Sequence, residues 1–368
     1  MDDATSGYAG LFDAPAGYLD FARYGPPSRA VLDATADALG RSARADHTTV
    51  DDLMRADARA RASAARLAGT DPDHTVLLPN TTTGLFQAAF GVPSGTVLVP
   101  EGDFPANHYP WRRTAAAGLA EPRWLHGRPT PEAVRDALTA DVTAVSLSAV
   151  DFRTGHRADL AAIRDVIGPD RLLVVDAIQG FGVADMPWQA ADVVVAGGQK
   201  WLRAGWSTGF AALSDRALER LAPTLTGWTG VEDVALFDGA EHPPAAGARR
   251  FSLTNLSPVA AAALAAALGI VESAGVPAIE SAVAARIDEL LDAVRSAGAE
   301  VLSETARPRR AGILSFRLPG VAPAEVAAAL HAHELTPTVR ADSLRLSPHA
   351  STPAWVAPQL AKALASLR

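Results

Sequence analysis

The sequence predicts an α/β fold built on a mostly parallel sheet, and two neighbouring stretches carry this prediction. Residues 172–175 and 193–195 are continuous runs of Leu and Val. Runs of this length are typical of strands that are buried on both faces of a parallel sheet. Asp176 follows the first run directly, and Lys200 follows the second after a short glycine turn. Strand-like runs also alternate with helical patterns along the chain, as such sheets require.

Length and composition indicate two domains. The chain has 368 residues, of which 48% are hydrophobic, enough for a large core. A large domain is predicted over residues 28–254. Residues 255–368 begin with a long Ala-rich helical block, the inter-domain helix, and end in alternating strands of a small α+β domain. The N-terminal segment, residues 1–27, is expected to pack on the small domain.

Charge and cysteine usage exclude several classes of function. The net charge is −8, without a basic stripe, so nucleic acid is a poor partner. No apolar run approaches the length of a membrane span, and the acidic N-terminus does not resemble a signal peptide, which together predict a cytoplasmic protein. The chain has no cysteine, which excludes disulfides, a catalytic thiol and Cys metal sites. No metal site is predicted.

Asp176 and Lys200 are expected to share one crevice, because ligands bind at the carboxyl ends of parallel strands. A lysine amine can form a Schiff base with pyridoxal phosphate, and an aspartate can pair with the pyridinium nitrogen of that cofactor. Either residue alone would more simply close a strand or a loop. The motifs Asp-x-x-Gln-Gly and Gly-Gly-Gln-Lys-Trp in succession favour the cofactor.

These motifs resemble those of the class V aminotransferase family, fold-type I pyridoxal phosphate enzymes that include cysteine desulfurases, isopenicillin N epimerase-like proteins and kynureninases. The resemblance extends over nearly the whole chain. It implies a large domain with a mostly parallel seven-stranded sheet, a small C-terminal domain and an amino-acid substrate. It also implies a homodimer with active sites at the interface.

Five further residues are expected to bind the cofactor or to line its site. Thr82 and Thr83 follow a strand and open a helix, where hydroxyls and free N–H groups bind phosphate as well as cap the helix. By resemblance, Gln199 would contact the phosphate and Gln179 would hydrogen-bond the phenolic oxygen of the ring. Phe104 would stack on the ring face.

Other roles follow from the resemblance to kynureninases. Trp228 would donate its indole N–H to the cofactor phosphate of the partner subunit, and Asn255 would face that same site.

The substrate is expected to bind through arginine. Arg345 falls at the family's substrate-carboxylate position, where a guanidinium fork suits a carboxylate, and Arg340 is the alternative. Asp151 stands where the similar segment of kynureninases usually has asparagine, and it is a further substrate candidate, together with Asn107. His47 lies in a loop and is expected to be solvated, with substrate contact as the less favoured alternative.

The predicted chemistry is Cα deprotonation of an amino acid by Lys200, and the fate of the substrate is left open. Without cysteine, persulfide transfer on this chain is excluded. A lyase that cleaves a C–S or related bond by β-elimination is favoured. Alternatives are kynureninase-like C–C cleavage, an aminotransferase and an amino-acid epimerase. A catalytically inactive binding protein is disfavoured by the presence of Lys200, Asp176 and Arg345 together.

Overall fold

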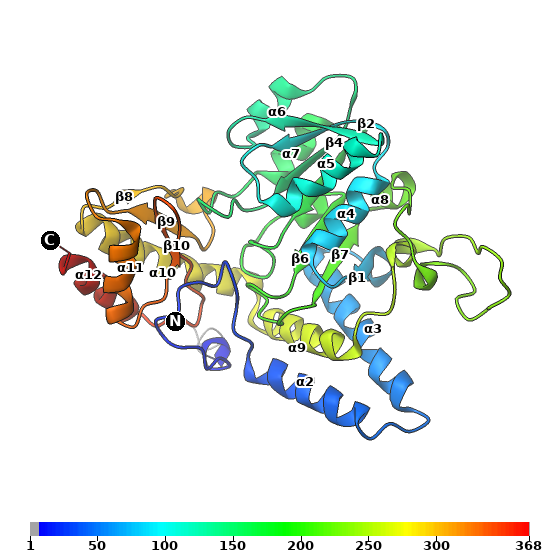
Figure 1. Ribbon diagram of the computed structural model, residues 1–368, viewed down its shortest axis with the longest axis horizontal. Coiled ribbons are helices and arrows are strands. Elements are labelled where there is room, and N and C mark those ends of the chain that lie inside the picture. Colours follow the sequence, from blue (N-terminus) through cyan, green and yellow to red (C-terminus); the bar gives the residue numbers. More distant parts are fainter. Residues whose placement is uncertain (1–6, 368) are drawn as a thin grey trace.

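The computed structural model describes residues 7–367, in two lobes that each contain one sheet (Figure 1). The larger sheet has seven strands, and all except β7 run in the same direction. Their order across the sheet is β1 (Thr75–Leu77), β7 (Gly209–Leu213), β6 (Val193–Gly197), β5 (Leu172–Asp176), β4 (Val142–Ser148), β2 (Gly95–Pro100) and β3 (Ala120–Leu125). The predicted α/β fold with a mostly parallel seven-stranded sheet is confirmed.

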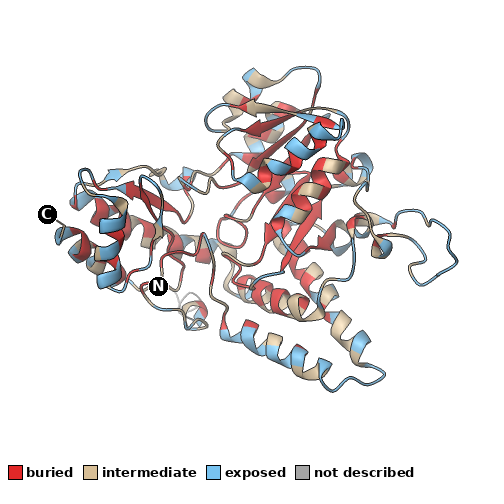
Figure 2. Ribbon diagram, in the orientation of Figure 1, coloured by how far each residue is buried: buried red, intermediate tan, exposed pale blue. Residues whose placement is uncertain are grey.

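The two central runs of the sequence form the strands expected of them. Alternate residues of β5 face opposite cores: Leu173 and Val175 lie in one cluster, and Leu172 and Val174 in the other. Burial on both faces explains why β5 is a continuous apolar run rather than an alternating one. Figure 2 shows the same burial across the strands of the large sheet.

Helices cover both faces of this sheet. The core on one face includes residues of α4 (Thr81–Gly91), α5 (Tyr109–Ala116) and α8 (Asp215–Arg220). The core on the other face includes residues of α2 (Arg29–Ser42), α3 (Thr49–Ala68), α6 (Pro131–Ala137), α7 (Leu160–Ile167) and α9 (Pro258–Ala274).

The small lobe has a four-stranded antiparallel sheet. Its strands follow the order β10 (Thr338–Val339), β11 (Leu344–Leu346), β9 (Leu314–Arg317) and β8 (Glu300–Val301). Apolar residues of α10 (Val276–Ser296), α11 (Pro323–Ala332) and α12 (Val356–Ala365) pack in the same core as this sheet. The α+β character expected of the C-terminal part is thus present in the structure.

Three strands were not expected from the sequence, namely β3, β8 and β10. The sequence of β3 is Ala-Glu-Pro-Arg-Trp-Leu, without an apolar run or regular alternation. It pairs only with β2, at the edge of the sheet, where a proline can be accommodated because one side needs no ladder hydrogen bonds. The strands β8 and β10 have two residues each, too short to leave a pattern.

The N-terminal segment extends from the small lobe to the large one. The N–H of Leu19 donates to Thr336 O (3.1 Å), and the N–H of Ser347 donates to Leu19 O (2.7 Å). Further along, the N–H of Gly25 donates to Gln199 O (2.9 Å). A side chain at Gly25 would collide with the carbonyl oxygen of Lys200, so glycine permits this close approach. The predicted domain boundaries stay a prediction, and residues 1–6 of the segment lie outside the described residues.

Within residues 7–367, no single helix is long and apolar enough to cross a membrane. The helices α9 and α10 reach that length and composition only together, and the chain bends by 82° between them.

Candidate active site

The carboxyl ends of β5 and β6 open into a cavity of about 490 Å³, which we call the Lys200 cavity. Asp176 is the last residue of β5, and Lys200 lies three residues beyond β6. The adjacent parallel pairing of these strands therefore brings both side chains to one edge of the sheet, as the sequence predicted. The residues that line the cavity are Ala22, Arg23, Asn80, Thr81, Thr82, Phe104, Ala106, Phe152, Asp176, Ile178, Gln179, Gln199, Lys200, Trp206, Thr338, Val339, Arg340 and Arg345.

The Asp176 carboxylate is poorly solvated. The residue is 2% exposed, and its Oδ1 accepts the N–H of Ile178 (3.0 Å). Burial raises the pKa of Asp176 well above its ordinary value, and the Asp103 carboxylate adds to this, against the N–H of Ile178 and the Lys200 amine. A cationic group in the cavity would restore the ionised carboxylate. A protonated pyridine nitrogen is such a group.

The pKa of the Lys200 amine is shifted in the opposite direction. Burial lowers its pKa, and the guanidinium groups of Arg345 and Arg340 lower it further, while Asp176 opposes them. A larger share of this amine is therefore neutral at a given pH than in a solvated lysine. A neutral amine is the form that attacks an aldehyde or accepts a proton.

An aromatic wall stands beside the lysine. Lys200 Nζ lies 5.4 Å from the centroid of the Phe104 ring, whose edge meets the ring of Phe152 at 5.2 Å between centroids. Phe104 is 40% exposed, so its ring is available to a ligand. Its predicted role as the stacking residue is compatible with this position.

The start of α4 forms the polar end of the cavity. Asn80 caps the helix by accepting the N–H of Thr83 (2.9 Å) and its hydroxyl (3.2 Å). Thr81 and Thr82 line the cavity, and the buried Thr81 Oγ1 has no hydrogen-bond partner among the described residues. A helix N-terminus with an unpaired hydroxyl fits a phosphate. Thr83 does not line the cavity, so its predicted phosphate contact is not supported by the geometry.

Asn80 and Thr81 were missed at the sequence level, although the signal was present. Asparagine is among the preferred N-cap residues, and its place before three threonines marks the start of the helix at Thr81. Gln199, predicted to contact the phosphate, lines the same cavity.

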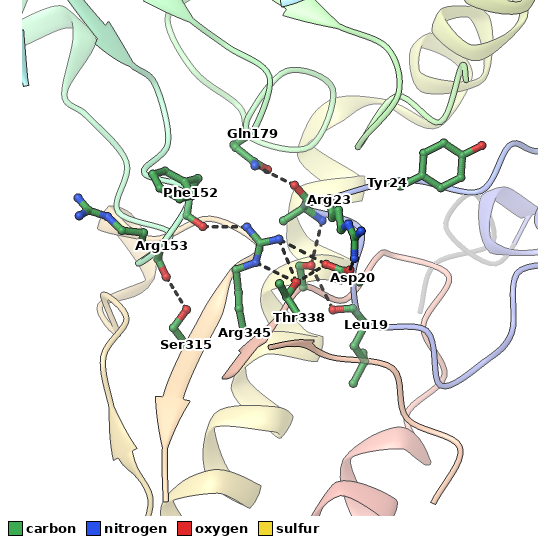
Figure 3. A network of polar contacts seen from close by, with 12 residues as sticks. Leu19, Asp20, Arg23, Tyr24, Phe152, Arg153, Gln179, Ser315, Thr338 and Arg345 are labelled. Carbon is green, nitrogen blue, oxygen red and sulfur yellow. Dashed lines mark hydrogen bonds and ion pairs between the residues drawn. The ribbon is translucent and has the colours of Figure 1, made fainter. Parts of the chain in front are cut away.

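The Gln179 side chain is held by two hydrogen bonds. Its Nε2 donates to Ala22 O (2.9 Å), and its Oε1 accepts the indole N–H of Trp201 (2.8 Å). Figure 3 shows this amide directed toward the N-terminal segment. One amide N–H is left for a ligand, so the predicted contact with a phenolic oxygen stays a prediction.

Arg345 reaches the cavity from β11, already held by protein groups (Figure 3). It is 3% exposed, and its Nη1 donates to Phe152 O (2.9 Å). Its Nη2 donates to Thr338 Oγ1 (3.0 Å) and lies 3.3 Å from Asp20 Oδ1. The Nε group also contacts Thr338 Oγ1 (3.3 Å). Because a guanidinium has five N–H donors, one N–H on Nη1 remains for a substrate.

Asn107 was predicted to bind substrate, and the structure corrects this. The residue is fully buried and is absent from the cavity lining. Its amide donates to Asp103 Oδ2 (2.9 Å) and accepts from Ser146 Oγ (2.6 Å). Asn107 thus helps to orient the Asp103 carboxylate.

Asp151 also lies outside the Lys200 cavity. Its Oδ1 accepts the backbone N–H groups of Arg153 (2.9 Å) and Thr154 (2.7 Å) and the Thr154 hydroxyl (2.9 Å). A short polar side chain that binds the backbone two or three residues ahead forms a turn. Asp151 therefore shapes the loop that carries Phe152, and it faces a neighbouring hollow of about 440 Å³ instead.

Trp228, Asn255 and His47 are not brought to the cavity of their own chain. Trp228 is 52% exposed, and Asn255 and His47 are exposed as well. The sequence missed Trp206, which lines the cavity mouth and stacks on Tyr24 (5.6 Å between centroids, 16° between planes).

The family model for aminotransferase class-V matches residues 18–341, and the chain belongs to this family of pyridoxal phosphate-dependent enzymes. Among curated proteins, kynureninase from Deinococcus radiodurans is 31% identical over 60% of this chain and 54% of its own length. Isopenicillin N epimerase from Streptomyces clavuligerus is 27% identical over 46% of each chain. The uncharacterized aminotransferase YcbU from Bacillus subtilis is 26% identical over 59% of each chain. The matches thus span about half of each relative.

Solved structures agree in fold over nearly the whole chain. A C-DES mutant with glycine covalently linked to its PLP cofactor superposes with a TM-score of 0.88, at 20% identity, over 99% of both chains. The cysteine desulfurase from Thermococcus onnurineus gives a TM-score of 0.85 at 18% identity, over 95% of this chain and 94% of its own. The predicted fold type I is confirmed.

Proposed function

We propose that this chain is a pyridoxal phosphate-dependent lyase. It would remove a sulfur-bearing or related substituent from the β-carbon of an amino acid, without passing sulfur to a thiol of its own. The observation that carries the proposal is the partly buried Lys200 amine, which shares a cavity with Asp176 and Phe104 in a chain without cysteine.

The residues of the cavity suit the cofactor at each of its ends. Thr81, Thr82 and Gln199 would hold the phosphate, Asp176 the ring nitrogen, and Phe104 the ring face. When bound, pyridoxal phosphate supplies an electron sink for the bond that breaks at the substrate Cα.

Lys200 would act as the general base. Its lowered pKa favours a neutral amine near pH 8, and general bases work best when their pKa lies near the working pH. The amine takes the Cα proton, the Cβ–S bond breaks, and the sulfur leaves as a thiolate that takes up a proton. Water then converts the remaining carbon skeleton to pyruvate and ammonia.

Arg345 would orient the substrate through the N–H that its protein partners leave free. Phe152 O, Thr338 Oγ1 and Asp20 fix the guanidinium, so a carboxylate that binds it adopts one orientation. With the cofactor bound, a fixed carboxylate would decide which bond of Cα is presented for cleavage.

The comparisons support elimination without an enzyme thiol. One structural neighbour, with a TM-score of 0.87, is the cystine C-S lyase C-DES in complex with its reaction product, cysteine persulfide. A lyase of this kind releases sulfur on a small product. This agrees with a chain that contains no cysteine to receive it.

A homodimer forms part of the proposal. The loop between α8 and α9 extends away from the large sheet and exposes apolar side chains, Trp228 (52%), Leu236 (54%) and Phe237 (87%). Exposed aromatic side chains of this kind are typical of protein interfaces. In a symmetric dimer, Trp228 and Asn255 would face the cavity of the partner.

An epimerase or an aminotransferase is the second candidate. Isopenicillin N epimerase and YcbU are about as similar to this chain as kynureninase is. Both alternatives begin with the same Cα deprotonation. An epimerase returns a proton to the opposite face of Cα, whereas an aminotransferase passes the amino group to an acceptor and releases a keto acid.

Proton NMR of the cofactor-loaded protein in D₂O, with S-substituted cysteines and common amino acids, separates the candidates. Pyruvate from an S-substituted cysteine supports the lyase. Exchange of the Cα proton for deuterium without loss of the side chain would instead support epimerisation or transamination. Lys362→Ala is the control, because the chain has two lysines and this variant leaves Lys200 as the single one.

A further inference from the structure

The Lys200 cavity carries more positive than negative charge. Four cationic side chains line it: Arg23, Lys200, Arg340 and Arg345. Asp176 is the one carboxylate among the lining residues, and it would pair with the ring nitrogen of the cofactor. The anionic phosphate is provided for at the start of α4, where Thr81 and Thr82 lie. Some of this positive charge is therefore left for the substrate.

Arg345 accounts for only part of this positive charge. Asp20, which is 4% exposed, lies 3.3 Å from Nη2 of Arg345 and balances its charge. The remaining donors of Arg345 are directed at Thr338 and Phe152, apart from one N–H. This arrangement suits a single substrate carboxylate.

Arg340 differs from Arg345 in its partners. Within residues 7–367, no carboxylate lies within 4.0 Å of its guanidinium, and no side-chain hydrogen bond holds it. The group lies 5.3 Å from the centroid of the Phe152 ring, at the aromatic wall. Its backbone is fixed, because the N–H of Arg340 donates to Ser343 O (2.8 Å). Arg340 is thus a positioned cation with free donors.

Arg23 lies across the mouth of the same cavity. Its side chain is 77% exposed, and its Nη1 is 3.9 Å from Asp20 Oδ2, too far for a hydrogen bond. The charges of Arg340 and Arg345 act on each other and on Lys200, since Arg340 lowers the pKa of both residues. An anion beside Arg340 would relieve this repulsion.

We propose that the cavity selects an amino acid whose side chain carries a second carboxylate, bound by Arg340 with Arg23 beside it, while Arg345 binds the α-carboxylate. This rests on the proposed function for the site and specifies its substrate class. A planar guanidinium with free donors is suited to a carboxylate in a bidentate geometry. Among S-substituted cysteines, the substrate would be one with an acidic substituent on sulfur.

Two matched substrates test this selection. S-carboxymethyl-L-cysteine and S-carbamoylmethyl-L-cysteine have the same shape and differ in one negative charge. With the cofactor-loaded enzyme, we expect kcat/KM for pyruvate release to be about tenfold higher for the acid, the size of one good charged contact. Arg340→Gln should reduce this ratio to about one, and the ratio is the readout because any general effect of the substitution acts on both substrates.

Arg295→Gln is the matched control, because Arg295 is exposed on α10 and does not line the cavity. It should preserve the ratio. Equal rates for both substrates in the unaltered enzyme would overturn the proposal. A preference for the acid that survives Arg340→Gln would overturn the assignment to Arg340.

A binding measurement keeps this test independent of the reaction. L-glutamate and L-glutamine lack a β-leaving group, and they differ as carboxylate and amide. Calorimetric titration of the cofactor-loaded enzyme should give a Kd about tenfold lower for glutamate, and Arg340→Gln should remove the difference. If glutamate is preferred but neither cysteine derivative yields pyruvate, the lyase fails and the anion site stands. Equal Kd values would refute the anion site.

Discussion

The two sides of the Lys200 cavity are built differently. On the large-lobe side, Asp176 and Lys200 follow neighbouring strands whose residues are buried on both faces, so the sheet fixes their positions. On the other side, Arg345 is fixed by Asp20, which lies 325 positions away in the sequence, on the N-terminal segment. The first side depends on a rigid scaffold, and the second depends on contacts between distant segments. We infer that reaction chemistry resides on the first and substrate choice on the second.

The largest effect on activity is expected from a substitution on the large-lobe side. Lys200→Ala removes the proposed general base and the cofactor attachment, and should lower the rate of product formation by roughly 10³-fold or more. The measurement is pyruvate release, or Cα-proton exchange if the second candidate holds. Lys362→Ala should behave like the unaltered enzyme, because Lys362 is exposed on α12. A comparable loss in both variants would contradict the assignment.

On the side of the cavity that contains Arg345 and Asp20, the main expected effect is on stability. Asp20→Asn keeps the shape of the side chain but leaves the buried Arg345 without its counter-charge, which should destabilise the fold by about 2–4 kcal/mol. Urea unfolding checks this. Asp13→Asn is the matched control, because Asp13 pairs with Arg29 at the surface, and it should give little change. Equal stability of the two variants would mean that the N-terminal segment does not hold Arg345.

These two sides also differ in how far the sequence predicted them. The place of Asp176, Lys200 and Phe104 at one cavity could be predicted because each lies at or soon after the end of a strand. The pairing of Asp20 with Arg345 could not, since nothing local links residues so far apart. For the same reason Asn107 and Asp151 were assigned to substrate, although a loop Asn or Asp satisfies buried groups and turns as readily as it binds a ligand.

A smaller effect is expected on the large-lobe side, where the ionised Asp176 carboxylate lowers the stability of the cofactor-free fold. Since burial raises the pKa of Asp176, its carboxylate destabilises the cofactor-free fold as pH rises above the ordinary carboxyl range and through the shifted value. Asp176→Asn should therefore raise the melting temperature of the cofactor-free protein at pH 8. The gain should fade as pH falls toward 4, where the carboxyl is protonated in both folded and unfolded states. Thermal unfolding at the two pH values checks this, and an equal gain at both would show that ionisation is not the cause.

The central claim is that Lys200, at the carboxyl edge of the large sheet, holds the cofactor. Reduction of the cofactor-loaded protein with borohydride, followed by peptide mass spectrometry, tests this claim directly. The chain offers only two lysines to the aldehyde, Lys200 and Lys362. The account predicts a phosphopyridoxyl group on the peptide that contains Lys200 and none on that of Lys362. A label on Lys362 alone, or an unlabelled Lys200 in a protein that has taken up the cofactor, would contradict it.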